Sequence, residues 1–139
     1  MRLPILVLVA LIQLPGGPPY SPQSALSTLR IEPGFRIELV TSEPDITSPV
    51  AMDIDEDGRW FVVEMPGYPL DTSPSGRIKL LEDTNGDGRP DKVTVFADQL
   101  VLPTGVMRWK RGVLVTAAPD VLYLKTPMAT ARPTNAPWC

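Results

Sequence analysis

Proline is spread through the whole chain and limits its fold more than any other residue type. The sequence of 139 residues contains 17 prolines. Proline removes a backbone donor and clashes with the preceding helical turn, so long helices are excluded over most of the chain. What remains is a succession of short apolar or alternating runs separated by Gly, Pro and Asp, which is typical of antiparallel β-structure.

These runs predict eight short strands and one short helix. The helix is expected at residues 22–29, with Ser21 as its N-cap. The Asp57-Gly58 dipeptide predicts a hairpin turn. The strands are expected at residues 35–40, 49–54, 60–64, 77–81, 92–96, 105–109, 112–116 and 121–125. The fold class is therefore all-β, an antiparallel meander with a short N-terminal helix and one long loop.

Charge and composition exclude several kinds of chemistry. The chain has no His, one Cys, 13 Lys and Arg, and 16 Asp and Glu, which gives a net charge of −3. There is no basic surface for nucleic acid, no His general base and no His metal ligand. A single Cys excludes an intrachain disulfide, a Cys-based zinc site and a covalent haem motif within this chain.

The N-terminus is typical of an export signal. Arg2 precedes an almost wholly apolar run at residues 3–14, followed by Gly and Pro. The run is too short to span a bilayer, which needs about 20 apolar residues. It fits the apolar region of a signal peptide over residues 1–25, which would place the mature protein in the periplasm or outside the cell. The alternative is a buried core segment.

The sequence repeats itself in the region of the strands. Residues 78–83 align with residues 121–126, and residues 58–63 align with residues 111–115. Pro49 with the following Ala and Met similarly parallels Pro103 with a later Val and Met. A period of about 40–45 residues with four strands predicts a β-propeller blade. Residues 26–125 then form a partial propeller, with one blade at about 49–97 and part of a second at about 104–125.

An acidic loop at residues 83–91 carries the one metal motif of the sequence. It places side-chain oxygens at loop positions 1, 3, 5 and 9 and a carbonyl at position 7, a spacing that suits a hard cation such as Ca²⁺. The alternative is a turn held by bonds from side chains to the backbone. The bidentate Glu of an EF-hand is missing, so any binding should be weak. The candidate ligands are Asp83, Asn85, Asp87, Arg89 through its carbonyl, and Asp91.

The repeat breaks after Lys125. The chain there continues with a Pro-, Thr- and Ala-rich tail at residues 126–139 where a second acidic loop is expected. Read one nucleotide earlier, the codons of this tail are compatible with Asp-Thr-Asp-Gly-Asp-Gly-x-x-Asp. We therefore expect residues 126–139 to be translated out of frame, as after a frameshift, and the nucleotide sequence tests this directly.

Several segments together resemble one family, the membrane-bound dehydrogenases with a glucose/sorbosone-dehydrogenase-like propeller. The resemblance covers most of residues 26–125 in order and spacing. The segments are Ile31-Glu32-Pro33-Gly34-Phe35, Glu64 with Gly67-Tyr68-Pro69, residues 76–83, residues 95–98 with Leu100, and residues 102–106.

The resemblance implies a propeller protein exported from the cytoplasm that oxidises a sugar or an alcohol with a quinone cofactor, PQQ. Glu64 and Tyr68 follow a strand and enter the loop at residues 65–75, so they are candidates for binding a substrate or the quinone. The alternative is that Glu64 is a solvated strand end and Tyr68 anchors the loop. The family's catalytic residues have no counterparts in this chain.

We expect the chain to be an N-terminal segment of such a propeller, inactive alone. With fewer than two blades, we expect open sheet edges that allow self-association and poorly covered apolar residues at Trp60–Val62, at Val113–Val115 and at Leu122. The alternative is a small secreted module that binds calcium, a carbohydrate or a protein.

Overall fold

The computed structural model describes residues 17–125 and 135–136. Residues 1–38 and residues 39–139 form two compact units, which are described separately. The apolar run expected in the export signal and most of the tail expected to be out of frame lie outside the described residues. Within the described part of the chain, no helix has the length and apolarity needed to cross a membrane.

The first unit contains the single described helix. Helix α1 (Pro22–Leu26) begins after Ser21, whose hydroxyl accepts a hydrogen bond from the backbone N–H of Ser24, so the predicted N-cap is confirmed. The helix ends three residues earlier than predicted. The strand predicted at residues 35–40 is wrong: these residues form an irregular segment, and Phe35 is exposed. Alternation of apolar and polar residues alone does not make a strand where no neighbouring strand supplies backbone partners.

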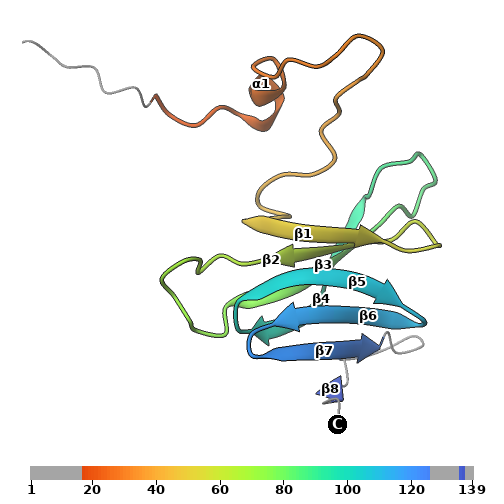
Figure 1. Ribbon diagram of the computed structural model, residues 1–139. Helices are drawn as coiled ribbons and strands as arrows, with labels where there is room; N and C mark the ends of the chain where they lie inside the picture. The colour runs from red at the N-terminus through yellow and green to blue at the C-terminus, as the bar shows by residue number, and fades with distance from the viewer. Residues whose placement is uncertain (1–16, 126–134, 137–139) are drawn as a thin grey trace, which may run out of the picture. The chain divides into compact units, whose positions relative to one another are not determined.

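The second unit begins with a four-stranded antiparallel sheet, here called the N-terminal sheet (Figure 1). Its strand order is β1-β2-β3-β4, so each strand pairs with the next along the chain. The long loop at residues 65–75 joins β2 to β3, and the acidic loop joins β3 to β4. The strands are β1 (Pro49–Ile54), β2 (Trp60–Glu64), β3 (Gly76–Glu82) and β4 (Lys92–Leu100).

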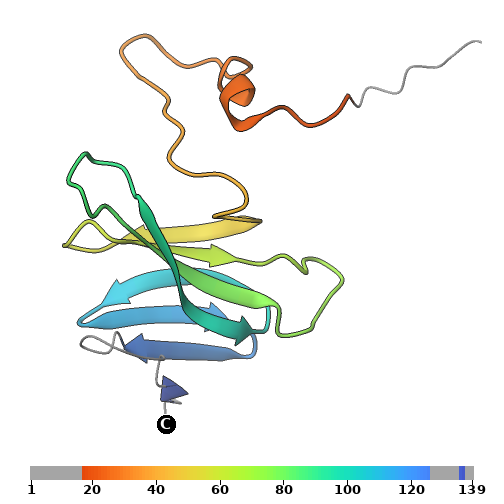
Figure 2. The same ribbon diagram turned by 180° about the vertical axis from the view of Figure 1, so that it is seen from behind.

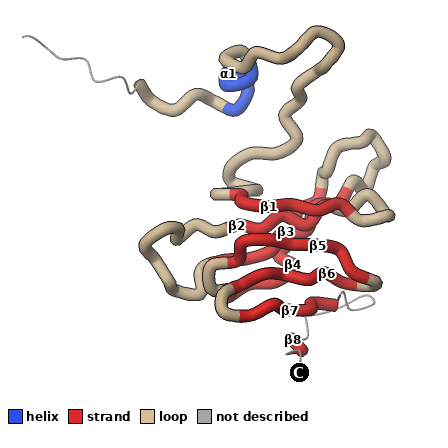
Figure 3. Tube along the Cα trace, viewed as in Figure 1, coloured by secondary structure: helices blue, strands red, loops and turns tan. Residues whose placement is uncertain are grey.

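A second antiparallel sheet follows, here called the C-terminal sheet. Its order is β5-β6-β7-β8, again a meander. Figure 2 shows both sheets from behind, with β3 and β4 toward the viewer, and Figure 3 marks the strands of both sheets in red. The strands are β5 (Pro103–Trp109), β6 (Gly112–Ala117), β7 (Asp120–Lys125) and β8 (Asn135–Ala136). The predicted all-β antiparallel class is confirmed.

The main core lies between the two sheets. Phe61 and Val63 on β2 share one buried cluster with Val113 and Val115 on β6. Phe61 also meets Phe96 of β4 edge to face, with ring centroids 5.2 Å apart. The expectation of poor coverage is therefore wrong for Phe61, Val113 and Val115, because each sheet covers one face of the other.

The opposite face of the N-terminal sheet has its own small cluster. Val62 and Leu81 alternate with the residues of the main core and so lie on the other side of the sheet. Ile46, from the segment that precedes β1, packs against both, and Trp60 and Val93 lie at the edge of the cluster. The face of the C-terminal sheet that points away from the N-terminal sheet carries exposed Met107, Trp109 and Val121.

Strand register confirms the repeat. In each sheet the first strand begins with a proline, and a bulge follows directly after it, at Pro49 and at Pro103. Aligning the bulges matches Val62 with Val115 on the second strands. The ladders then match Ile78 with Val121 on the third strands, as the sequence alignment predicts.

The two repeats use opposite faces in their contact. Val115 is buried against the N-terminal sheet, whereas its equivalent Val62 is buried under Ile46 on the far side. Ile78 lies in the main core, whereas its equivalent Val121 is 53% exposed. The front of the first sheet thus packs on the back of the second. Contacts of this kind are heterologous, because repeating them carries a structure onward around a ring or along a stack.

A close approach joins the two sheets at one end. A Cβ atom on Gly76, the first residue of β3, would lie 2.3 Å from Cδ of Pro103, the first residue of β5. It would also lie 2.8 Å from the carbonyl oxygen of Leu100. Only glycine fits at this position without moving β5.

Candidate functional site

Glu64 is the last residue of β2 and is fully buried. It lies opposite Pro49 of β1 and Arg77 of β3. By alternation it shares the face of Val62, away from the C-terminal sheet. The interpretation of Glu64 as a solvated strand end is therefore wrong.

Four polar groups contact the Glu64 carboxylate, two from Thr47 in the segment before β1 and two from side chains of β3. Oε1 accepts a hydrogen bond from the backbone N–H of Thr47 at 2.6 Å and another from the Thr47 hydroxyl at 3.5 Å. Lys79 Nζ lies 3.6 Å from Oε1, and Arg77 Nε lies 2.6 Å from Oε2. The Arg77 contact is an ion pair by distance, but its N–H does not point at Oε2 as in a hydrogen bond. Two cations and one anion leave a local excess of positive charge.

The same residues hold the segment before β1 on the sheet. Lys79 Nζ donates to the carbonyl oxygen of Asp45, and the side chain of the next residue, Ile46, is buried in one cluster with Val62 and Leu81. A buried carboxylate is costly unless it is paired and hydrogen-bonded, and here both conditions are met. Glu64 therefore has a structural task, which is to fix residues 45–47 over the face of the N-terminal sheet.

Tyr68 lies in the loop at residues 65–75 and is 68% exposed. It does not anchor the loop through its side chain, so that interpretation is also wrong. The loop is held instead by Asp71, whose N–H donates to the Gly67 carbonyl at 2.8 Å. Hydrogen bonds from the backbone and then the hydroxyl of Ser73 hold the pKa of Asp71 below its usual value. Glu64 and Tyr68 are thus not joined in one pocket.

The acidic loop curls around its own carboxylates. Asp83 accepts from the backbone N–H groups of Gly86 and Gly88, each at 2.7 Å. Asn85 and Asp87 each accept from the N–H two residues further on. These are the side-chain-to-backbone bonds of the turn interpretation.

Asp91 closes the loop. Its carboxylate accepts from the backbone N–H of Thr84 at 3.0 Å and from the Thr84 hydroxyl at 2.8 Å. These hydrogen bonds, the backbone one first, lower the pKa of Asp91. Among the described residues, no group of three or more acidic side chains is arranged as a metal-binding set. The calcium prediction for this loop is not tested by that geometry and stays a prediction.

The quinone implied by the family resemblance does not fit the two candidate residues. Glu64 is covered and ion-paired, and Tyr68 lies exposed on a separate loop. A polar cofactor needs several groups that converge on one cavity. These two side chains do not converge, so no catalytic step is derived through a quinone.

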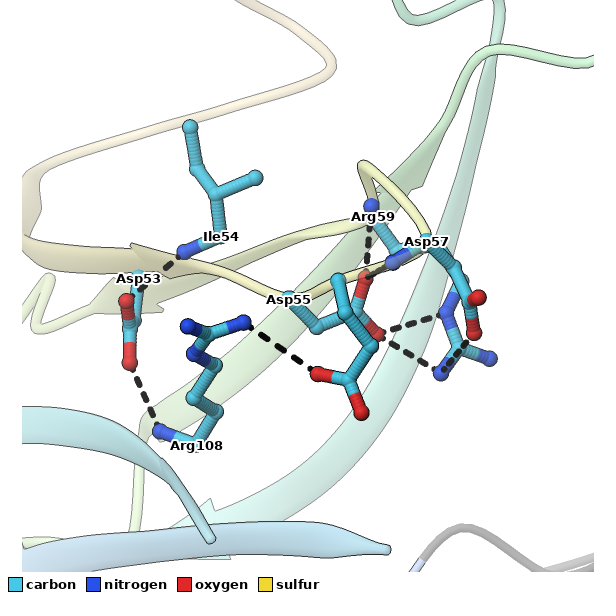
Figure 4. A network of polar contacts seen from close by, with 7 residues as sticks. Asp53, Ile54, Asp55, Asp57, Arg59 and Arg108 are labelled. Atoms are coloured by element: carbon cyan, nitrogen blue, oxygen red, sulfur yellow. Dashed lines mark hydrogen bonds and ion pairs between the residues drawn. The ribbon is translucent and has the colours of Figure 1, made fainter. Parts of the chain in front are cut away.

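A third polar network links the hairpin between β1 and β2 to the C-terminal sheet (Figure 4). Asp55 accepts from the backbone of Asp57 and from both the backbone and the side chain of Arg59, and the side-chain hydrogen bond is the main cause of the raised pKa of Arg59. Across the sheets, the backbone N–H of Arg108 donates to Asp53 at 2.7 Å. The hairpin turn predicted from Asp57-Gly58 is confirmed, with Gly58 at a φ of 75°.

The sequence interpretation missed Thr47, Arg77 and Lys79 as partners of Glu64. The signal that could have found two of them is their spacing, since Arg77 and Lys79 lie two residues apart in a strand and hence on one face. Thr47 carries no such signal, because its contact depends on how the preceding segment folds back.

These features define the class: an all-β protein built from two repeated antiparallel sheets packed front to back. The comparison with known families gives a match over most of the chain. Residues 21–129 match the family described as a domain of unknown function, DUF7133, and the chain belongs to that family. No curated protein and no solved structure matches the chain.

Proposed function

We propose that the two sheets are the first two blades of a β-propeller and that the chain is the opening segment of an exported dehydrogenase-like propeller protein. In this role it supplies scaffold and does not form a complete catalytic site. The observation that supports the proposal is the front-to-back contact between repeats. The equivalent residues Val62 and Val115 both lie on the back of their own sheet, and Val115 packs there on the front of the first sheet.

The main alternative architecture is a closed two-layer sandwich. Two equivalent sheets related by a two-fold axis would bury equivalent residues against each other. Here Ile78 is in the shared core and its equivalent Val121 is on the surface. In a propeller, each blade is a four-stranded meander that packs on the next blade. Equivalent residues of two neighbouring blades can therefore differ in burial, as Ile78 and Val121 do here.

The loops that connect the strands indicate where a ligand would contact the proposed propeller. The loop between β2 and β3 and the turn between β4 and β5 lie at the same end of the strands, as Figure 3 shows. Two side chains of the long loop, Tyr68 and Leu70, are 68% and 91% exposed. In the proposed propeller they would reach a sugar or alcohol together with loops of further blades, so the chain alone should not turn over substrate.

The proposal is tested by two measurements. The first is the nucleotide sequence beyond codon 125, read in all frames, which should continue with an acidic Gly-rich loop and further blade repeats. The second is dye-linked, quinone-dependent oxidation of sugars and alcohols by this chain and by the chain extended in that frame. Activity of the 139-residue chain alone would contradict the proposal, as would a neighbouring frame without blade repeats.

The calcium-binding module stays an alternative prediction of the sequence. Isothermal calorimetry with Ca²⁺ separates it from the scaffold proposal. A stoichiometric heat, a higher melting temperature and the loss of both in Asp83→Ala would support the module.

A further inference from the structure

The C-terminal sheet carries an apolar surface on the side away from the N-terminal sheet. We call it the open face, made of residues on three adjacent strands. Met107, Trp109 and Val121 on this face are each about half exposed, at 49%, 46% and 53%. Contiguous apolar surface of this kind marks sites of interaction in soluble proteins. The open face consists of Met107, Trp109, Leu114, Val121 and Tyr123.

The open face repeats, position by position, a face that is already covered inside the chain. With the bulges aligned, Leu114 corresponds to Phe61 and Val121 to Ile78. Phe61 and Ile78 are the residues that the N-terminal sheet presents to the C-terminal sheet, and both are buried there. The internal contact therefore shows which kind of surface fits the open face.

That fitting surface occurs twice in the chain. One copy is the inner face of the C-terminal sheet, with Val115 and Leu124, and it is already used. The other is the equivalent face of the N-terminal sheet, with Val62 and Leu81, which we call the back face. Met52 on the same face is 52% exposed, so part of it is accessible.

From this equivalence we propose that the chain associates with second copies of itself head to tail, the open face of one copy packing on the back face of the next. The inference rests on the front-to-back repeat that supports the proposed function. It differs from pairing of sheet edges, because the contact is made by apolar side chains. Roughly two to four copies would then provide the four to eight sheets that close a propeller ring.

Ile46 limits this association. Its side chain lies over Val62 and Leu81, at the centre of the back face. The segment is held there by Glu64 through Thr47 and by Lys79 through Asp45. A second copy must displace Ile46, so weakening its hold should strengthen self-association.

Sedimentation velocity and light scattering over a concentration series test the proposal. The full chain is compared with Val121→Lys, which blocks the open face at the position equivalent to the buried Ile78, and with Met52→Asp, which blocks the back face. Leu70→Asp is the matched control, because Leu70 is 91% exposed in the loop after β2 and lies on neither face. Leu114→Lys, at the position equivalent to the buried Phe61, serves as a second open-face variant, and circular dichroism confirms that each variant is folded.

We expect each single-face variant to associate weakly alone and the two variants to associate with each other when mixed. Each single-face variant should associate about tenfold more weakly than the parent chain, the size expected for a central apolar contact. An equimolar mixture of Val121→Lys and Met52→Asp should form a discrete heterodimer, since each retains the face that the other lacks. Ile46→Ser should increase association of the parent chain, and Leu70→Asp should leave it unchanged.

Other outcomes overturn the inference. A parent chain that stays monomeric at all concentrations contradicts it, and so does association that persists in both single-face variants, which indicates edge pairing. A dimer that is lost in Val121→Lys but kept in Met52→Asp indicates a two-fold contact between open faces. In each case the contact between the two sheets within one chain can still be observed by NMR, so failure here is distinguishable from failure of the blade proposal.

Discussion

Val62 on β2 and Val115 on β6 occupy equivalent positions of the two sheets, yet they are buried on different sides of the N-terminal sheet. Val115 packs against its front, and Val62 packs under Ile46 on its back. This relationship distinguishes a directional stack of repeats from a symmetric sandwich. It also explains why the outer apolar face of the C-terminal sheet is exposed, whereas that of the N-terminal sheet lies under Ile46.

The face assignment predicts unequal effects for two valines of the C-terminal sheet. Val115 is fully buried, whereas Val121 on the neighbouring strand is half exposed. We expect Val115→Ala to lower the free energy of unfolding by about 2 kcal/mol, because it leaves a cavity in the shared core. Val121→Ala should change it by less than about 0.5 kcal/mol. Urea unfolding followed by circular dichroism measures both, and equal losses would contradict the assignment.

Glu64 is predicted to stabilise the fold through its ion pairs. In Glu64→Gln the bond from the Thr47 N–H can persist, but the ion pairs with Arg77 and Lys79 are lost. Removing one partner of a buried charge cluster is destabilising, and Arg77 is partly exposed, so we expect a loss of about 2 kcal/mol. Residues 45–47 should also lose protection from hydrogen exchange. Unchanged protection with reduced ligand binding would instead indicate a binding role for Glu64.

The pKa of Asp91 gives a pH dependence with a definite sign. Because the folded-state pKa lies below the unfolded value of about 3.9, the contribution of Asp91 is fully present above that pH. It is lost as the pH falls through the lower, folded-state pKa. Carboxyl ¹³C NMR should show a titration midpoint below that of an unfolded Asp. Thr84→Val should raise the midpoint, since the side-chain hydroxyl is removed, and a midpoint unaffected by this change would contradict the assigned contact.

The contact of Gly76 with Pro103 predicts a steric effect at the junction of the sheets. A Cβ at residue 76 would meet the proline ring at 2.3 Å, which requires β5 to move. We expect Gly76→Ala to cost about 1–3 kcal/mol in the free energy of unfolding, as overpacking does. Gly17→Ala is the control, because nothing lies within 4 Å of the Cβ it would add. Thermal unfolding of the two variants compares them, and equal melting temperatures would argue against this junction.

Much of the fold could be predicted because local pattern and tertiary structure agree. All seven strands predicted from residue 49 to residue 125 are present, since Gly, Pro and Asp-Gly turns bound each run. The strand predicted at residues 35–40 is absent because a period of two gives no information about a partner strand. The hairpin could be predicted from Asp57 and Gly58 alone, because the conformation of such a turn depends on its own residues.

The candidate site was harder to predict for a physical reason. Whether Glu64 is solvated or buried depends on Arg77 and Lys79 across the strand and on Thr47 from an irregular segment. None of these contacts is local in sequence. The acidic loop is local, and its hydrogen bonds follow the Asp and Asn spacing that the sequence shows.

Methyl NOE spectroscopy on selectively labelled protein tests the central relationship most directly. Our account predicts cross-peaks from the Val113 and Val115 methyl groups to the Phe61 and Val63 side chains, and from Val62 to Ile46. Cross-peaks from Val113 or Val115 to Val62 or Trp60, in place of those, would contradict it.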